Sequence, residues 1–577
     1  MKFFIDILFL LIFVSALGAQ NRYSVSGTIT DKGNGETLAG AAVTVDELPG
    51  TGISSNTYGY YALSLPEGKY TIIINYLGYE TVELEINLNQ NIRRDIRMEV
   101  LATDLREVDV YPFKRNDNIL LNNIGSEKIL VSEIKNIPVF FGEQDIMKTI
   151  SLTPGATSVR DGNNGIYVRG GGNDQNLIIL DEAIVYHPSH LLGFFSTFNS
   201  DAIKEMTLYK GTAPASYGGR ISSVMDIRMK DGNNQSLEVD GGIGLISSRL
   251  AIEGPIVKDR GSFIVAGRRT YVDMLLKLTN DPNLNSNTLN FYDLNAKINF
   301  KINPKNQIFI SAYSGRDAFA VPGRFGLAWG NRTASFRWNH IWQDKLFSNT
   351  SVIYSDFDYE VDLAFEPSAF SVLSGIKNFN FKHEFNYFIS ENSRFILGYD
   401  MLAHNITPGQ LVADENAVVH PMKIQERNGK EQTVYLSNEF RPSPNWIFNI
   451  GIRLNTFRLY GPGDFYKYEN GTLSETITYT KDEVVKSYFS PERRLNITHI
   501  INPVQSVKIS YSTHTQNIHM ITATENLSLP VNIWIMSGNN VKPQKSDQFS
   551  AGYFRNMRND MYQFAAEAYY KLMHDQI

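Results

Sequence analysis

Hydrophobic and polar residues alternate with a period of two over much of the second half of the chain. In residues 379–387 the odd positions carry aromatic rings or histidine, and the even positions carry asparagine, lysine and glutamate. The same alternation occurs at residues 336–342, 450–455 and 507–514. A period of two is typical of β-strands with one apolar and one polar face. Its repetition predicts an antiparallel sheet, either a transmembrane barrel or, as the alternative, a soluble β-sandwich or propeller.

The N-terminal residues have a different rhythm, with short strands between glycine-rich turns. Strand-like runs occur at residues 23–30, 42–45, 60–65 and 70–76. Roughly six or seven short strands with frequent turn signals are typical of a small sandwich. The pattern therefore predicts a β-sandwich over residues 22–100.

Between these regions, residues 165–228 consist of short apolar runs joined by glycine turns. The turn at residues 169–174 contains three consecutive glycines, which allow positive φ angles. Upstream, residues 143–150 place three apolar side chains on one helical face, those of Ile146, Met147 and Ile150. These features predict an α+β domain over residues 116–232, so the whole chain is expected to be mainly β.

Composition narrows the class of protein only in part. The chain has 54 lysines and arginines against 60 aspartates and glutamates, so no basic field suggests a nucleic-acid partner. It contains no cysteine, which excludes disulfides and thiolate metal sites. The apolar run at residues 7–14 follows Lys2 and ends in small residues, which predicts a signal peptide over residues 1–19. No later run reaches the ~18 apolar residues of a spanning helix.

No group of residues in the sequence indicates catalysis or a resident metal. None of the ten histidines is followed by a glutamate three residues later, and the zinc motif His-Glu-x-x-His does not occur. His187 and His190 lie close in sequence to Asp181 and Glu182, a combination that could suggest a metal, but Pro188 opposes a helix that would present both histidines. We therefore expect no enzyme activity, no cofactor and no metal site.

Five short pieces of this middle region closely resemble the plug domain of TonB-dependent outer-membrane receptors, in the order found in that family. They are Val168–Gly171, Asp174–Asn176, Leu180–Asp181, Leu208–Gly211 and Tyr217–Arg220. The resemblance implies that this domain closes the lumen of a barrel. It identifies as plug-motif residues Arg169, Gly170, Gly171, Asp174, Asp181, Lys210, Gly211, Tyr217, Gly218, Gly219 and Arg220.

Four of these residues are charged, namely Arg169, Asp181, Lys210 and Arg220. We expect them inside the protein, in contact with one another or with the barrel wall, because a buried charge must be paired. The alternative is that they are solvated at the surface. The chain departs from the family pattern at Glu182, where many relatives carry glycine, which puts the form of that turn in doubt.

The N-terminal sandwich is similar to the carboxypeptidase-regulatory-like domain of receptors from Bacteroidetes-type bacteria, which implies a spacer or docking unit. Residues 101–115 are expected to be a linker that contains a TonB-box-like segment, carried by Leu105, Glu107, Val108 and Val110. A detached extended segment of this kind can add as a strand to the sheet of another protein. The alternatives are the last strand of the sandwich or a plain linker.

Residues 236–577 form the expected barrel region. Plugged transporters are 22-stranded, and at about 25 residues per strand and connection they need on the order of 550 residues. The 342 residues available suffice for about 14 strands. We therefore expect a C-terminally truncated sequence and an incomplete antiparallel transmembrane β-barrel.

The resemblance implies a transporter in the bacterial outer membrane that imports a scarce small solute, with the N-terminal domain in the periplasm. Its expected partners are the TonB complex of the inner membrane, which supplies the energy, outer-membrane lipid and the solute. The identity of the solute and the use of a surface lipoprotein as a lid remain open. The alternative is an adhesion or structural surface protein without active transport.

Overall fold

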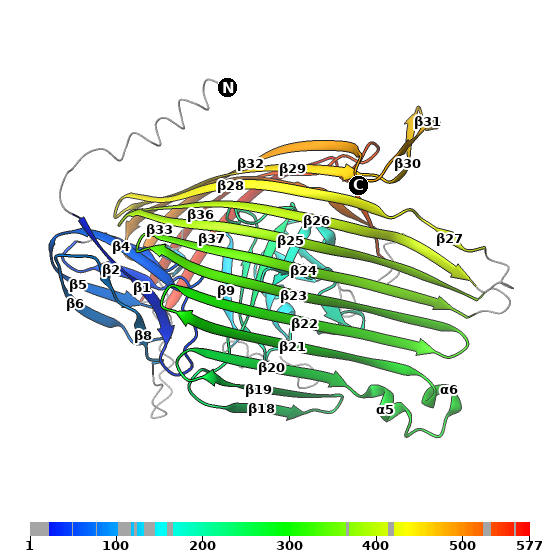
Figure 1. Ribbon diagram of the computed structural model, residues 1–577, viewed down its shortest axis with the longest axis horizontal. Helices are drawn as coiled ribbons and strands as arrows, with labels where there is room; N and C mark the ends of the chain where they lie inside the picture. The colour runs from blue at the N-terminus through cyan, green and yellow to red at the C-terminus, as the bar shows by residue number, and fades with distance from the viewer. Residues whose placement is uncertain are drawn as a thin grey trace.

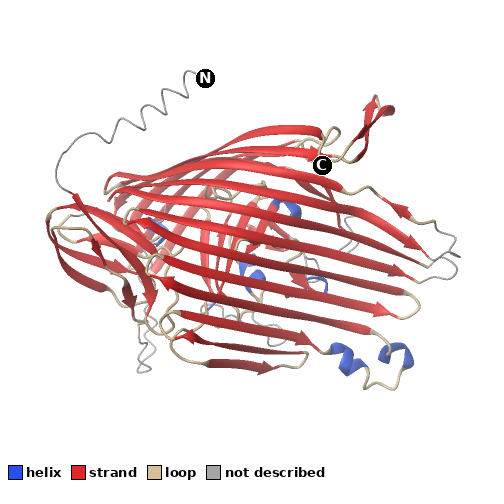
Figure 2. Ribbon diagram, viewed as in Figure 1, coloured by secondary structure: helices blue, strands red, loops and turns tan. Residues whose placement is uncertain are grey.

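The computed structural model describes residues 22–48, 50–76, 78–101, 117–120, 124–131, 145–158, 165–364, 369–413, 420–522, 532–558 and 561–577. The predicted signal peptide and TonB-box-like segment lie outside these residues. Strands dominate the fold, and the few helices are short (Figure 2). No helix among the described residues is long and apolar enough to cross a membrane.

The N-terminal region is a sandwich of two small sheets, as the strand spacing predicts. One sheet has the order β4-β1-β7, with β8 also paired to β1, and the other has the order β3-β2-β5-β6. Val25, Leu63 and Ile74 are fully buried between them. The strands are β1 (Arg22–Asp31), β2 (Ala42–Val45), β3 (Gly52–Ser54), β4 (Tyr60–Pro66), β5 (Gly68–Asn75), β6 (Val82–Leu88), β7 (Ile92–Arg93) and β8 (Ile96–Met98).

The middle region is an α+β domain built on a five-stranded sheet with the order β13-β12-β17-β16-β9. Its strands are β9 (Ser126–Leu130), β10 (Ala156–Ser158), β11 (Ile166–Val168), β12 (Asn176–Leu180), β13 (Ala183–Ile184), β14 (Ser189–His190), β15 (Phe195–Ser196), β16 (Ile203–Tyr209) and β17 (Ser223–Met229). Its helices are α2 (Asp117–Leu120), η1 (Asn173–Gln175), η2 (Leu191–Gly193) and α4 (Ile146–Ser151). Asp145 caps α4, and the predicted apolar face of this helix is buried in the core of the domain.

Most of the remaining described residues form one large antiparallel sheet of 16 strands, close to the expected number of about 14. The strands follow one another in chain order from β18 to β37, and β27 is a two-residue addition to β26. Their bounds are β18 (Glu238–Ile243), β19 (Ser247–Val257), β20 (Gly261–Thr270), β21 (Thr288–Asn303), β22 (Asn306–Val321), β23 (Phe325–Gln343), β24 (Leu346–Leu363), β25 (Phe370–Ser390), β26 (Ser393–Ala413), β27 (Met422–Lys423), β28 (Arg427–Ser443), β29 (Trp446–Tyr460), β32 (Val484–Asn502), β33 (Gln505–Gln516), β36 (Gln544–Met557) and β37 (Tyr562–His574).

The alternation along these strands separates an apolar outer face from a polar inner face, as predicted. On β25, Phe379 and Tyr387 are exposed, whereas Asn380 and Asn386 are buried against the interior. On β33, Ile509 is exposed and Lys508 is buried. A sheet with its apolar side chains on the convex face and its polar side chains toward the lumen is typical of membrane barrels.

The sheet curves around the α+β domain, and its two ends differ (Figure 1). The sandwich lies against short turns at one end, here called the sandwich end. The opposite end, here called the loop end, carries α5 (Val272–Leu276), α6 (Pro282–Asn285) and the β30–β31 hairpin (Gly463–Glu469 and Thr472–Tyr479). The β34–β35 hairpin (Ile518–Thr522 and Asn532–Met536) packs against wall residues near the same end.

Candidate functional site

The candidate functional site is the interface between the α+β domain, called the plug below, and the inner face of the curved sheet. The apolar core of the plug includes Ala251 on β19, Ala266 on β20 and Tyr313 on β22. On the opposite side, Thr212 in the plug donates a hydrogen bond from its hydroxyl to Ser510 on β33, over 3.1 Å. The plug therefore lies within the curvature of the sheet and contacts its wall on both sides (Figure 1).

Arg169 joins the glycine turn of the plug to the last strand of the sheet. Its guanidinium is almost completely buried and lies 2.7 Å from the Glu567 carboxylate on β37 and 4.9 Å from the centre of the Tyr569 ring. The backbone of Arg169 has a φ of 48°, and Gly170 follows with a φ of 75°. A β-carbon on Gly171 would collide with Ser222. The RGG turn is therefore shaped to bring one arginine to the wall.

Lys210 and Gly211 occupy a second contact between plug and wall. The Lys210 ammonium is buried 2.7 Å from Glu127 and donates a hydrogen bond of 2.9 Å to the carbonyl of Pro154. Its own carbonyl accepts a hydrogen bond of 3.3 Å from Gln548 on β36. A β-carbon on Gly211 would collide with the same glutamine. Glycine at this position therefore allows the wall to approach the plug backbone.

Asp181 forms part of a buried ion chain on the sandwich side of the plug. Lys297 on β21 lies 2.9 Å from both Asp181 and Asp231, and the other Asp181 oxygen accepts a hydrogen bond from the backbone amide of Met229. Asp181 and Glu182 both have positive φ angles, of 44° and 74°. Glu182 thus adopts a conformation that favours glycine, which answers the question raised by its departure from the family pattern.

Asp174 and Arg220 lie on the loop side of the plug, where they contact the β34–β35 hairpin. The Asp174 carboxylate accepts hydrogen bonds of 3.1 Å from Gln516 and 3.3 Å from the backbone amide of Met520, and burial raises the pKa of Asp174. Arg220 lies 5.8 Å from the centre of the Trp534 ring. Arg220 is buried, and no ion pair between its guanidinium and a carboxylate is found among the described residues.

The Tyr217-Gly218-Gly219 turn faces strand β29. The Tyr217 hydroxyl donates a hydrogen bond of 2.9 Å to Asp226 within the plug. A β-carbon on Gly218 would collide with the Arg453 side chain. Arg453 in turn donates hydrogen bonds to the carbonyls of Ala215 and Ser216. Because Gly218 has no side chain, Arg453 of the wall lies close enough to donate hydrogen bonds to the plug backbone.

His190, which the sequence places close to His187, is the centre of a buried polar cluster whose other members lie far away in the sequence. Its two ring nitrogens each contact a carboxylate of the wall, Asp293 at 2.7 Å and Asp317, and the ring stacks on Phe291. Burial by itself lowers the pKa of His190, but the two carboxylates outweigh it and raise the pKa to about 9. With both nitrogens facing carboxylates, the imidazolium is the form that satisfies both partners.

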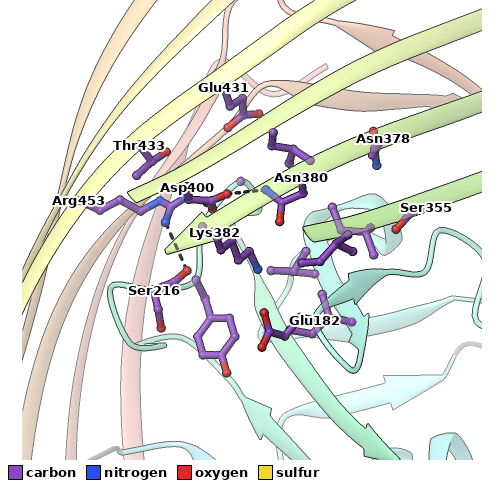
Figure 3. Close-up of a pocket in the computed structure, with 18 residues that line it drawn as sticks. Glu182, Ser216, Ser355, Asn378, Asn380, Lys382, Asp400, Glu431, Thr433 and Arg453 are labelled. Carbon is purple, nitrogen blue, oxygen red and sulfur yellow. Dashed lines mark hydrogen bonds and ion pairs between the residues drawn. The ribbon is translucent and has the colours of Figure 1, made fainter. Parts of the chain in front are cut away.

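A pocket remains open between the plug and strands β24 to β29 (Figure 3). The plug contributes an apolar face together with Glu182 and the turn at residues 216–219. The wall contributes polar and charged side chains, of which Asp400 lies 3.3 Å from Arg453 and accepts a hydrogen bond of 2.6 Å from Asn380. The wall side chains are Ile353, Ser355, Asn378, Asn380, Lys382, Asp400, Leu402, Glu431, Thr433 and Arg453. The empty space, including solvent at its mouth, is about 600 Å³.

The sandwich contacts both the wall and the plug. The Tyr60 hydroxyl donates a hydrogen bond of 2.6 Å to the carbonyl of Asp344, in the turn between β23 and β24. Glu36 of the sandwich lies 3.1 Å from Lys204 of the plug, and its carboxylate also accepts a hydrogen bond from the backbone amide of Asp231. These contacts connect the domain nearest the N-terminus to the element that closes the lumen.

The motif analysis located the plug side of this interface but not the wall side. Glu567, Lys297, Asp293 and Trp534 belong to no short motif. Glu567 shares its strand with a second charged residue of the same parity, Lys571, so the pattern of charges did not single it out. The predicted segment of Leu105, Glu107, Val108 and Val110 lies outside the described residues.

Three family models match successive parts of the chain. A CarboxypepD_reg-like domain matches residues 25–110, a TonB-dependent receptor plug domain matches residues 135–224, and a TonB-dependent receptor-like β-barrel matches residues 270–577. No curated protein sequence matches the chain.

Solved structures with a similar fold include the siderophore receptor PirA from Acinetobacter baumannii, with 13% sequence identity and a TM-score of 0.56 over 79% of this chain and 71% of that one. The copper transporter OprC has 13% identity and a TM-score of 0.57 over 78% and 71%. A mutant of the ferric enterobactin receptor PfeA from Pseudomonas aeruginosa has 13% identity and a TM-score of 0.56 over 79% and 71%. At identities this low, the similarity to these solved structures shows only a shared fold. The match to the family model of the β-barrel spans more than half of the chain. The protein belongs to the family of TonB-dependent receptors, which are β-barrel proteins of the outer membrane.

Proposed function

We propose that the protein imports a small solute across the outer membrane, with energy supplied by the TonB complex of the inner membrane. The observation that carries this proposal is the polar character of the contacts between plug and wall, which include the Arg169–Glu567 ion pair and the hydrogen bond between Thr212 and Ser510. Each hydrogen bond of this kind has a net worth of about 0.5–1.5 kcal/mol, because water replaces it when it breaks. These polar contacts exchange for contacts with water when the plug moves, in contrast to the apolar contacts that the plug makes with Ala251, Ala266 and Tyr313.

In this proposal the sandwich lies in the periplasm, and TonB binds Leu105, Glu107, Val108 and Val110 as an added strand. The segment precedes the plug in the chain, so that a pull on it acts on the plug. No covalent step is involved. The match to the CarboxypepD_reg-like domain extends to residue 110, and in the alternative assignment the same segment is the last strand of the sandwich.

The test removes residues 105–110 from the protein in its native outer membrane. We expect uptake to be abolished while solute binding at the cell surface persists. Growth on candidate nutrients, with and without the intact gene, identifies the solute first; a ferric siderophore and copper are candidates because relatives of similar fold are named for them. Collapse of the proton gradient should likewise stop uptake, whereas an adhesion protein would go on binding.

A matched pair of point variants separates the two assignments of the segment. Val108→Pro removes a backbone donor and blocks strand addition, whereas Val108→Ala keeps the donor. We expect the proline variant to lose uptake and the alanine variant to retain it, with unchanged hydrogen exchange in the sandwich. Equal uptake by both variants, or a sandwich destabilised by proline, would contradict the assignment of this segment as the strand that TonB binds.

A further inference from the structure

The inward-facing residues of β25 change from apolar to polar and back to apolar along the barrel. Ile376, nearest the loop end, belongs to a buried apolar cluster, and Phe388, nearest the sandwich end, belongs to another. Between them Asn378, Asn380 and Lys382 line the pocket of Figure 3. The neighbouring strand β24 has Phe357 and Phe347 at the same two levels, with Ser355 and Ile353 at the pocket between them. The pocket is therefore a chamber with both polar and apolar wall side chains, between two apolar layers.

Each apolar layer is completed by a segment from outside the plug and the wall. At the loop end, Trp534 and Met536 of the β34–β35 hairpin pack in one cluster with Trp329 and Phe357 of the wall. At the sandwich end, Tyr58 and Tyr60 stack on Phe347, with ring centres 5.4 and 5.5 Å apart. The chamber is thus bounded by two elements whose removal would not require the wall to unfold.

The acidic groups that line the chamber already have partners. Asp400 is paired with Arg453 and Asn380, as described above. Glu431 accepts a hydrogen bond of 2.9 Å from Asn455 and lies 3.6 Å from His404. Glu182 lies 3.7 Å from Arg337. The carboxylates of the chamber are therefore engaged with groups of the protein.

Three donors that line the chamber have capacity left over. The Thr433 hydroxyl and Nε of Arg453 are buried without a hydrogen-bond partner among the described residues, and Thr433 and Arg453 are only 1% and 3% exposed. The Lys382 ammonium has no hydrogen bond or ion pair within the part of the chain that the structure describes. A buried donor left unpaired destabilises the protein, so an acceptor bound in the chamber would be stabilised by these groups.

The opposite side of the chamber is apolar. Leu177, Ile179 and Ile184 of the plug sheet line it, and the Tyr217 ring lies beside them. We propose that the chamber is a binding site for a solute with an anionic oxygen group, such as a carboxylate, facing Lys382 and an apolar flank facing the plug. The proposal names the chemical class of the solute and rests on the proposed import only for the direction in which the solute moves.

The test uses the absence of cysteine from the chain. Ser216→Cys introduces one thiol, similar in size to the serine hydroxyl, on the plug side of the chamber. The position is partly exposed and is labelled in Figure 3. The purified full-length variant is treated with two thiosulfonate reagents, one that carries an anionic sulfonate group and one that carries a cationic ammonium group. The rate of thiol labelling by each reagent is divided by the rate at which the same reagent labels a free thiol in solution. We expect the anionic reagent to be favoured by about fivefold, corresponding to roughly 1 kcal/mol of Coulomb attraction.

Lys382→Met should abolish this preference, whereas Lys377→Met, the same change at an exposed position of β25, should leave it intact. As a second measurement that needs no further substitution, benzoate should slow labelling of Cys at position 216, and benzamide, its neutral analogue, should not. Equal rates for the two reagents, a cationic preference, or equal protection by benzamide would overturn the proposal. None of these outcomes depends on TonB, so they leave the test of import separate.

Discussion

Single side chains at the interface between plug and wall carry charges that depend on partners far away in the sequence. His190 contacts Asp293 and Asp317 on two wall strands, and Arg268 shares Asp293 with it. Two cations and two carboxylates therefore form one neutral cluster. Removal of one member of such a buried cluster leaves an uncompensated charge, which typically costs about 3–5 kcal/mol.

The His190 cluster predicts a pH dependence of plug docking. The pKa of His190 is about 9 in the folded protein and about 6.5 in an unfolded chain. A raised pKa means that the stabilisation is fully present below about pH 6.5 and is lost as the pH rises to about 9. We expect the apparent Tm of the wild type to fall over this interval more than that of His190→Gln.

His187→Gln is the matched control, because burial lowers the pKa of His187 to about 4 and keeps this ring neutral across the same interval. This variant should show the wild-type slope of Tm against pH. The assignment fails if His190→Gln and the wild type have the same slope, because another group would then be responsible for it.

Among the elements, the β34–β35 hairpin has the most unusual position. It leaves the barrel wall after β33 and packs into the loop-end apolar cluster rather than extending away from the sheet. The backbone amide of Met520 in the hairpin donates a hydrogen bond to Asp174, and the Trp534 ring contacts both Arg220 and Tyr186 of the plug. Because these contacts join a loop to two plug-motif residues, a movement of the hairpin is expected to be felt by the plug.

Trp534→Ala should loosen the hairpin, since truncation of a buried tryptophan typically costs about 3–5 kcal/mol. The expected result is faster hydrogen exchange at residues 518–522 and 532–536, with β33 unchanged. Trp338→Ala is the control, because Trp338 lies on the outer face of β23 and is exposed. Unaltered exchange in the hairpin after the Trp534 change would show that other contacts hold it.

At the scale of the whole molecule, the sandwich is docked on the barrel rather than suspended from a linker. Phe347 and Phe388 of the wall belong to the same buried cluster as the core of the sandwich. Lys345 and Asp344 of one short turn both bond to the sandwich. The domain therefore covers part of the sandwich end of the lumen, next to the plug.

Phe347→Ala should release the sandwich, because it removes the ring on which Tyr58 and Tyr60 stack. With a protease site inserted in residues 102–116, we expect the cleaved sandwich to remain with the wild-type barrel on size-exclusion chromatography and to separate from the variant. Phe336→Ala, on the exposed outer face, should behave as the wild type. Separation from the wild-type barrel after cleavage would contradict stable docking.

The sequence alone determined the elements and their order, because local patterns encode them. Period-two alternation specified which face of each wall strand is apolar, turn clusters delimited the strands of the sandwich, and five spaced pieces identified the plug. Gly211 and Gly218 were identified as plug-motif residues by the resemblance to the family, and in the structure the side chains of Gln548 and Arg453 approach them closely.

Only the tertiary structure decided which charges meet. Arg169 and Glu567 are nearly 400 residues apart, and the pairing of Lys297 with Asp181 depends on how the plug sits against β21. Inward-facing polar residues follow the same pattern along every strand. The sequence therefore cannot distinguish residues that line the chamber from residues that form hydrogen bonds or ion pairs with the plug. That distinction depends on the position of the plug within the curved sheet, which is a property of packing between distant segments.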